Sequence, residues 1–124
     1  ESVQPRVLVV DDEVAVNNNI RIILAKKGYQ VEQATGKDEA LELISRMQFS
    51  LVLLDLWMPG VTGLKLLEAI RDKQPEAKVI IITGYASIET AVEAARMGAV
   101  DYLQKPFTPD EGRNATDHAL RLAA

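Results

Sequence analysis

The sequence predicts an α/β fold: a doubly wound sandwich in which helices cover both faces of a five-stranded parallel sheet. Three observations support this fold class. Short runs rich in Val, Ile and Leu recur along the 124 residues, segments of helical periodicity lie between them, and no linker or low-complexity tract interrupts the alternation. Near-continuous apolar strands are typical of a parallel sheet buried on both faces, because a strand with one wet face would alternate apolar and polar residues. Right-handed crossovers then produce a (βα)5 arrangement.

Five segments are predicted to form the strands. They are Arg6–Val10, Gln30–Ala34, Ser50–Leu54, Lys78–Ile82 and Asp101–Gln104. We expect these strands in the order 2-1-3-4-5, which is the usual order of a flavodoxin-like sheet. The length fits one domain, so we assign residues 1–5 to an N-terminal extension and residues 6–124 to a single domain.

Helices are predicted wherever apolar residues recur at i, i+3, i+4 and i+7. The residues that mark these faces are Val16, Ile20, Ile23 and Leu24; Ala40, Leu43, Ile44 and Met47; Leu66, Leu67 and Ile70; and Ile88, Ala91, Val92 and Ala95. Gly28 and Gly98 stand where two helices would stop, and Pro75 closes a third. The last helix, residues 110–124, is expected to be weak and loosely docked, because Gly112 and Thr116 lower helix propensity.

Composition excludes several classes of protein. There are no cysteines, which removes disulfides and thiolate chemistry, and the formal net charge of −4 provides no drive towards nucleic acid or anionic membranes. The apolar runs are far shorter than the ~20 residues that span a bilayer, and no signal peptide opens the chain. We therefore expect a cytoplasmic domain that binds neither DNA nor membranes directly.

Polar residues end four of the five predicted strands, and open parallel sheets bind ligands beyond the carboxyl ends of their strands. The residues are Asp11 and Asp12 after the first strand, Asp55 after the third, Thr83 after the fourth and Lys105 after the fifth. Two carboxylates about 4 Å apart repel by roughly 4 kcal/mol at an effective dielectric constant of 20, so a cation should compensate them. Mg²⁺ suits such a site and leaves room for phosphate oxygens. The set predicts a phosphoryl site with Asp55 as nucleophile.

Each residue has a simpler interpretation when it is taken alone. Asp12 and Glu13 could merely cap a helix, Thr83 could be an ordinary residue at a strand end, and Lys105 could be solvated. Complementary groups at four strand ends, in this chain order, favour the phosphoryl site over a set of unrelated residues.

Four segments, VVDDE, LLDLWMPGVTG, IIITGYAS and DYLQKPF, resemble in order and spacing the receiver domain of two-component response regulators, over essentially residues 6–123. The resemblance implies that a sensor histidine kinase phosphorylates Asp55. It also implies that Asp11, Asp12, Asp55 and the backbone carbonyl of Trp57 hold Mg²⁺.

The same resemblance assigns roles to the end of the site that carries Lys105. Thr83 and Lys105 are expected to contact the phosphoryl group, and the Lys105–Pro106 peptide bond is expected to be cis. Tyr102 corresponds to a switch aromatic whose ring turns inward as Thr83 moves towards the phosphate. Such a domain is a signalling module rather than an enzyme, and it catalyses only its own phosphorylation and slow dephosphorylation.

The resemblance also implies partners and an output. The segment TGYASIETAVEAARMGAVDYLQKPF is most similar to receivers of AAA+ enhancer-binding transcriptional activators. We therefore expect an output module, in cis or on a partner protein, that controls transcription. The face formed by the fourth helix, fifth strand and fifth helix is expected to change on phosphorylation, and a phosphorylation-dependent homodimer is a further candidate partner.

Several residues depart from the family pattern. Trp57 and Tyr85 are bulky where many receivers carry smaller or polar groups, which predicts restricted water access and a long-lived acyl phosphate. The three residues 17–19, all Asn, are expected on the exposed side of the first helix, where they could tune the choice of kinase, and His118 is expected to be solvated.

Two other functions remain open from the residues alone. A haloacid-dehalogenase-like phosphatase also uses an aspartyl nucleophile, but it requires a second aspartate two residues later, where this chain has Trp57. A nucleotide-binding module would require a GxGxxG or P-loop segment, and neither follows a predicted strand.

Overall fold

The fold was analysed in a computed structural model that describes residues 4–58 and 60–122. Its main sheet has five parallel strands, whose neighbours run in the order β2-β1-β3-β6-β7. These strands are β1 (Arg6–Val10), β2 (Gln30–Ala34), β3 (Leu51–Asp55), β6 (Lys78–Thr83) and β7 (Asp101–Gln104). Counted along the chain, this is the predicted order 2-1-3-4-5, and it confirms the fold class.

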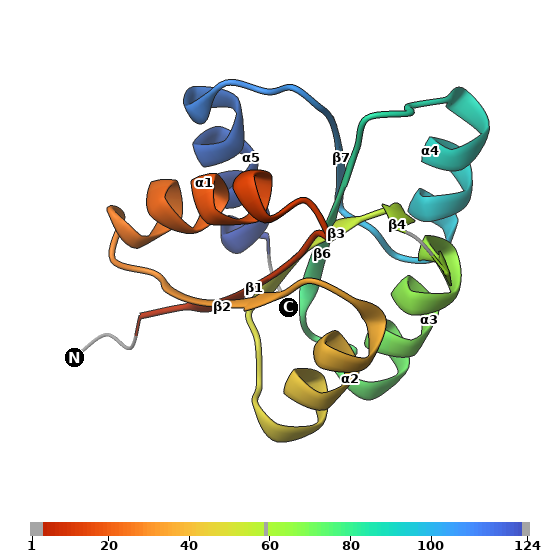
Figure 1. Ribbon diagram of the computed structural model, residues 1–124, viewed down its shortest axis with the longest axis horizontal. Helices are drawn as coiled ribbons and strands as arrows, with labels where there is room; N and C mark the ends of the chain where they lie inside the picture. Colours follow the sequence, from red (N-terminus) through yellow and green to blue (C-terminus); the bar gives the residue numbers. More distant parts are fainter. Residues whose placement is uncertain (1–3, 59, 123–124) are drawn as a thin grey trace.

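In the described part of the chain, five helices cover the two faces of this sheet (Figure 1). They are α1 (Val14–Ala25), α2 (Lys37–Arg46), α3 (Gly63–Lys73), α4 (Ile88–Arg96) and α5 (Pro109–Arg121). Helices α1 and α5 pack on one face, and α2, α3 and α4 pack on the other. None of the helices in the described part of the chain combines the length and the apolar character that crossing a membrane requires.

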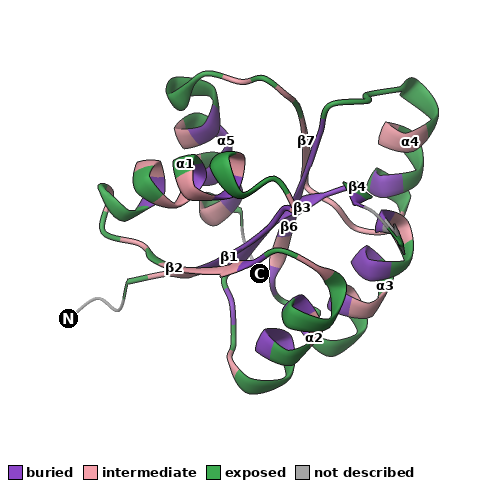
Figure 2. Ribbon diagram, viewed as in Figure 1, coloured by how far each residue is buried: buried purple, intermediate pink, exposed green. Residues whose placement is uncertain are grey.

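The central strands divide their side chains between two cores, because successive residues of a strand point to opposite faces. The core under α2 and α3 takes from these strands Leu8, Val10, Val52, Leu54, Val79 and Ile81. The core under α1 and α5 takes Val7, Val9, Leu51, Leu53, Ile80 and Ile82. Figure 2 shows the result: the central strands are buried and the outer sides of the helices are exposed. The apolar runs are thus buried on both faces, as the sequence predicted.

A small hairpin that the sequence did not predict follows β3. Strands β4 (Trp57–Met58) and β5 (Val61–Thr62) pair antiparallel just before α3. Strand β3 also ends at Asp55, one residue later than expected, and β6 ends at Thr83. The two polar residues are therefore the last residues of their strands.

Helix ends follow local signals. Gly28 and Gly98 have φ values of 90° and 100°, the left-handed conformation that favours glycine after a helix. Helix α5 has a complete capping box, in which the Thr108 hydroxyl accepts from the Glu111 N–H and the Glu111 carboxylate accepts from the Thr108 N–H. Pro109 occupies the first turn of the helix.

The apolar stripe predicted for α4 does not lie against the sheet. Ile88 is 84% exposed and Val92 is 45% exposed, whereas Ala94 is buried against the sheet. Two residues that are two positions apart point in directions about 200° apart around a helix. Because Ala94 points to the sheet, Val92 points to solvent. The apolar periodicity was real, but it marked a stripe that faces solvent.

The expected position of Asn17 is also wrong. Asn17 is fully buried, while Asn18 is half-buried and Asn19 is exposed. The reason is helical geometry, because Asn17 precedes the buried Ile20 and Leu24 by three and seven residues and so shares their face. His118 is exposed, as expected.

Candidate functional site

The acidic residues that follow β1 and end β3 converge at one edge of the sheet. One carboxylate oxygen from each of Asp11, Asp12 and Asp55 lies within 4.8 Å of the others. Strands β1 and β3 are neighbours, and Val10 is in register with Leu54, so the residues that follow them emerge side by side. Asp11 and Asp55 are buried, and Asp12 is half-buried. The predicted convergence of these three residues is thus observed.

Asp11 is held from two directions. Its Oδ1 atom accepts a hydrogen bond of 2.9 Å from the Glu13 N–H. Its backbone carbonyl accepts one of 3.0 Å from Asn17 Nδ2, which also donates at 3.0 Å to the carbonyl of Ala34 at the end of β2. The buried amide of Asn17 therefore fixes the end of β1 against β2 and positions Asp11.

Asp55 is held by one backbone and one side-chain donor. Its Oδ1 accepts a hydrogen bond of 3.0 Å from the Trp57 N–H, and its Oδ2 accepts one of 3.2 Å from Lys105 Nζ. Burial, supported by the negative charge of Asp11, raises the pKa of Asp55 to about 6 despite these two donors. Asp55 is therefore harder to ionise here than in water, chiefly because it is buried.

Lys105 reaches into this cluster from the end of β7. Its Nζ lies 2.8 Å from Asp11 Oδ2, 2.8 Å from Glu13 Oε1 and 3.2 Å from Asp55 Oδ2. Burial opposes its charge, but the hydrogen bonds and charges of Asp11 and Glu13 outweigh burial and hold the pKa of Lys105 above its ordinary value. The Lys105–Pro106 bond is cis, the isomer that the resemblance implied.

The cluster fits a hard divalent cation such as Mg²⁺. Its donors are carboxylate oxygens, the ligands that this ion takes in proteins. Asp11 Oδ2 is buried and, although ion-paired with Lys105, accepts no well-aligned hydrogen bond. The ammonium group of Lys105 is the one positive charge beside four carboxylates, those of the three aspartates and of Glu13, among the described residues. A bound cation would therefore supply positive charge that the cluster lacks.

Thr83 and Tyr102 lie on the side of the site nearer α4. Thr83 is fully buried, and its Oγ1 accepts a hydrogen bond of 3.0 Å from the Tyr85 N–H. The Tyr102 ring is half-buried, and its hydroxyl lies 2.7 Å from Thr90 Oγ1 on α4. A hydrogen bond of 2.7 Å from the Lys105 N–H to the Thr83 carbonyl joins β7 to β6 at this end. Tyr102 is therefore tied to α4 and stands apart from the acidic cluster.

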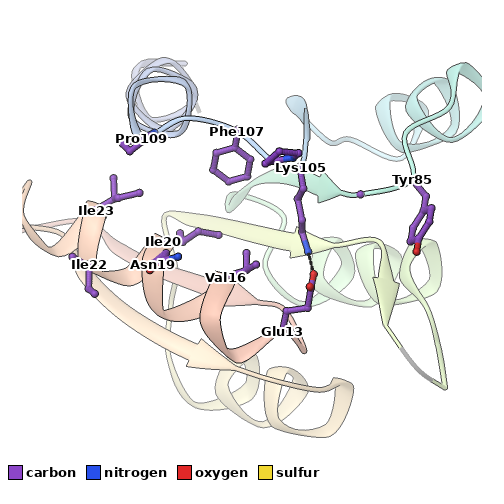
Figure 3. A pocket seen from close by; sticks show the side chains of 12 residues that line it. Glu13, Val16, Asn19, Ile20, Ile22, Ile23, Tyr85, Lys105, Phe107 and Pro109 are labelled. Atoms are coloured by element: carbon purple, nitrogen blue, oxygen red, sulfur yellow. Dashed lines mark hydrogen bonds and ion pairs between the residues drawn. The ribbon is translucent and has the colours of Figure 1, made fainter.

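A groove of about 750 Å³ opens beside Lys105 (Figure 3). Its walls include the apolar side chains of Val16, Ile20 and Ile23 from α1 and Phe107 from the segment before α5. Figure 3 shows Glu13 and Lys105 joined at one end and Tyr85 on the far side of Lys105.

Two residues of the site were not predicted to belong to it from the sequence. Glu13 was considered only as a helix cap, although its position directly after an acidic pair was a signal. Asn17 was assigned to the surface, and only its helical spacing to Ile20 and Leu24 could have revealed its burial.

Comparisons with known proteins identify the family. Residues 7–117 match the response regulator receiver domain. The chain is 43% identical over 107 residues to a putative NtrX-like response regulator from Rickettsia felis. The aligned residues make up 85% of this chain and 22% of that protein. The chain is also 40% identical over 119 residues to the alginate biosynthesis transcriptional regulatory protein AlgB from Pseudomonas aeruginosa. This alignment covers 96% of this chain and 26% of the relative.

A solved structure shows the same architecture. A response regulator protein from Burkholderia pseudomallei, crystallised with a phosphorylated aspartic acid, a calcium ion and citrate, superimposes with a TM-score of 0.83 at 34% identity. The match covers 93% of this chain and 72% of that one. The chain spans about a quarter of the length of the curated relatives it matches. Receiver domains are signalling domains, and this chain belongs to the response regulator receiver domain family.

Proposed function

We propose that this domain is a phosphorylation-dependent switch in which Asp55 takes a phosphoryl group from a phosphohistidine of a sensor histidine kinase. A carboxylate oxygen of Asp55 attacks phosphorus, an O–P bond forms, and the N–P bond breaks with its electron pair going to the imidazole nitrogen. Hydrolysis reverses the state: water attacks phosphorus, the O–P bond breaks, and the Asp55 carboxylate and inorganic phosphate are released.

The surrounding residues have separate tasks in this proposal. Lys105, which already contacts Asp55, neutralises charge on the transferred group, and the Thr83 hydroxyl donates to one of its oxygens. Asp11, Asp12, Asp55 and the backbone carbonyl of Trp57 would hold Mg²⁺, which supplies positive charge to the transferred oxygens when it is bound.

One observation carries the proposal. Asp55 is buried at the end of β3, the central strand of the sheet, and its carboxylate accepts hydrogen bonds from both the Trp57 N–H and Lys105 Nζ. Burial raises the pKa of Asp55 to about 6. This value is still below neutral pH, so most of the carboxyl group is ionised and nucleophilic there.

Phosphorylation with a small donor tests the proposal. The protein is incubated with Mg²⁺ and acetyl phosphate, and intact mass and hydroxylamine sensitivity report an acyl phosphate. Wild type and a control variant at an exposed acidic position, Asp72→Asn, should acquire one phosphoryl group, whereas Asp55→Asn should acquire none. Hydroxylamine-sensitive phosphate on Asp55→Asn would refute the assignment.

The output would be a changed surface on α4, β7 and α5. Movement of Thr83 towards the phosphoryl group alters the packing of Tyr102, whose hydroxyl is bonded to Thr90 of α4. We expect this face to act on an output module, in cis or on a partner protein, or on a second copy of the domain. A transcriptional output is supported by the likeness to AlgB, and this domain itself would not contact DNA.

Amide NMR spectra test this switching step. A phosphate mimic with Mg²⁺ should shift signals between residues 84 and 108 in wild type and leave them unshifted in Asp55→Asn. Unchanged wild-type signals in that segment, with the mimic bound, would rule out the proposed output face. The cytoplasmic location stays a prediction from the sequence.

A further inference from the structure

Glu13, the residue after the acidic pair, directs its side chain towards Lys105. It is the N-cap residue of α1, but its carboxylate makes no capping hydrogen bond to the helix. Oε1 of Glu13 instead accepts a hydrogen bond of 2.8 Å from Lys105 Nζ, on an element far away in the sequence (Figure 3). The side chain therefore does not cap the helix, which was its simplest interpretation from the sequence.

Glu13 differs from the other carboxylates that contact Lys105 in its exposure to solvent. The side chain of Glu13 is 61% exposed, whereas those of Asp11 and Asp55 are 0% and 3% exposed. Glu13 and Lys105 both line the groove of about 750 Å³. A phosphoryl donor that approaches Lys105 along this groove therefore meets the charge of Glu13 before it reaches Asp55.

The charge of Glu13 acts against an anionic donor in two ways. Glu13 lies outside the group of three carboxylates, those of Asp11, Asp12 and Asp55, that could hold a cation, so a cation bound there would leave its charge in place. That charge repels a negatively charged donor at the rim of the site. Glu13 also competes with the donor's phosphoryl oxygens for the ammonium group of Lys105. Both effects grow with the negative charge of the donor.

We propose that Glu13 is a specificity-determining residue, which makes the site discriminate between phosphoryl donors by their charge. It disfavours acyl phosphates, which are dianions at neutral pH, relative to donors with an N–P bond, such as a phosphohistidine, whose leaving nitrogen takes up a proton and its positive charge. The inference rests on the proposed function and deepens it, because it names the class of donor that the site selects. Glu13 thereby protects the domain from phosphorylation by small acyl phosphates.

Two small donors isolate the effect of charge, because both give the same product on Asp55. Acetyl phosphate is a dianion, whereas the protonated nitrogen of phosphoramidate leaves that donor with less net negative charge. With either donor a carboxylate oxygen of Asp55 attacks phosphorus and an O–P bond forms. With acetyl phosphate the bond to the acyl oxygen breaks and its electron pair leaves on acetate. With phosphoramidate the N–P bond breaks and its electron pair leaves on ammonia.

The ratio of the two phosphorylation rate constants, acetyl phosphate over phosphoramidate, tests the proposal in saturating Mg²⁺ with intact mass as the readout. Glu13→Gln keeps the size of the side chain and removes its charge, so this ratio should rise by about three- to tenfold. The rise should shrink as KCl is added, because salt screens exposed charges. Glu68→Gln, at an exposed position on α3, removes the same charge elsewhere and should leave the ratio unchanged.

Other outcomes reject this role of Glu13. Equal changes in rate with both donors would leave the ratio at its wild-type value and show that Glu13 does not distinguish between them. A raised ratio that persists undiminished at high salt would show an effect of shape rather than of charge. The proposed function is tested in the same samples. If wild type takes no phosphoryl group on Asp55 from either donor, that function fails and the inference with it, whereas normal labelling with an unaltered ratio rejects the inference alone.

Discussion

At the scale of single residues, hydrogen bonding separates structural polar groups from those of the site. Buried Gln74 is fully engaged: its Oε1 accepts from the Phe49 N–H, and its Nε2 donates to the carbonyls of Ile44 and Met47. Such bonds offset the cost of burying a polar group. Asp11 and Asp55 are also buried, but Asp11 Oδ2 accepts no well-aligned hydrogen bond, and burial raises the pKa of Asp55 to about 6. A buried polar group that the fold leaves under-compensated marks the place where a ligand would bind.

Asn17 provides a test of this distinction. Asn17→Ala should lower the free energy of unfolding by about 1–3 kcal/mol, because it removes two buried hydrogen bonds to backbone carbonyls. The exposed Asn19 supplies the matched control, and Asn19→Ala should change that free energy by less than about 0.5 kcal/mol. Urea unfolding measures both, and equal effects of the two changes would show that the bonds of Asn17 contribute nothing.

At the scale of elements, α4 shows how a helix can expose an apolar stripe. The helix packs on the sheet through Ala94, which allows close approach, and it leaves Ile88 and Val92 in solvent. Exposed apolar side chains on one face of a helix are typical of interaction sites. This stripe belongs to the face that we propose as the output surface.

Adjacent alanines report the orientation of α4. Ala94→Leu should cost about 1–3 kcal/mol of stability by overpacking the contact with the sheet. Ala95→Leu, at the next and exposed position, should alter stability by less than about 0.5 kcal/mol. Thermal unfolding of the two variants distinguishes them, and the reverse ranking would mean that the helix is rotated.

A second element-scale feature joins α1 to α5. Asp117 of α5 accepts from Lys27 Nζ at 2.5 Å and from the Tyr29 hydroxyl at 2.9 Å, just beyond the end of α1. The bond from Lys27 lowers the pKa of Asp117, and burial together with the bond to Asp117 raises the pKa of Tyr29 to about 12. These two side-chain links, with the capping box, dock the helix that the sequence had predicted to be loose.

The sign of the Asp117 shift determines a pH dependence. A carboxyl group whose pKa is lower in the folded state stabilises the fold above its unfolded pKa of about 3.9 and loses that contribution as the pH falls below it. Asp117→Asn should therefore cost about 0.2–1 kcal/mol near neutral pH, a small value because the pair is partly exposed, and should cost less near pH 3. Urea unfolding across this range measures the difference, and a cost that grows on acidification would contradict the link.

At the scale of the whole molecule, the fold concentrates uncompensated charge at one end of the sheet. The ends of β1, β3 and β7 bring carboxylates and one lysine together, although they are far apart along the chain. Asp55 is harder to ionise in the folded state than in the unfolded state, as its raised pKa shows. The chain therefore gives up stability to maintain this site, a trade common at functional sites.

The trade predicts how stability responds to charge and to metal. In chelator above about pH 6, Asp55→Asn should raise the free energy of unfolding by about 1–3 kcal/mol, because asparagine avoids the cost of ionising a buried carboxyl group. This gain should vanish below about pH 4, where Asp55 of wild type is protonated in both the folded and the unfolded state. Mg²⁺ at 100 times its dissociation constant should stabilise wild type by about 2.7 kcal/mol and Asp55→Asn by much less.

Thermal unfolding with and without Mg²⁺ measures both effects. Asp72→Asn, at an exposed position on α3, controls for the loss of one negative charge and should respond to Mg²⁺ as wild type does. Equal stabilisation of wild type and Asp55→Asn by Mg²⁺ would place the ion elsewhere.

The sequence alone determined the fold class, the strand order and the membership of the acidic cluster. These features depend on local patterns: apolar runs mark buried parallel strands, and residues at the carboxyl ends of parallel strands share one edge of the sheet. Asp11, Asp12, Asp55 and Lys105 could therefore be brought together before any distance was known.

Only the tertiary structure decided which apolar stripe of α4 faces the sheet, that Asn17 is buried, that Glu13 shares Lys105, and that the rings of Trp57 and Tyr85 meet. Each of these depends on the rotation of a helix or on the course of two separate loops. Periodicity along the chain carries neither quantity, because packing between elements sets both of them.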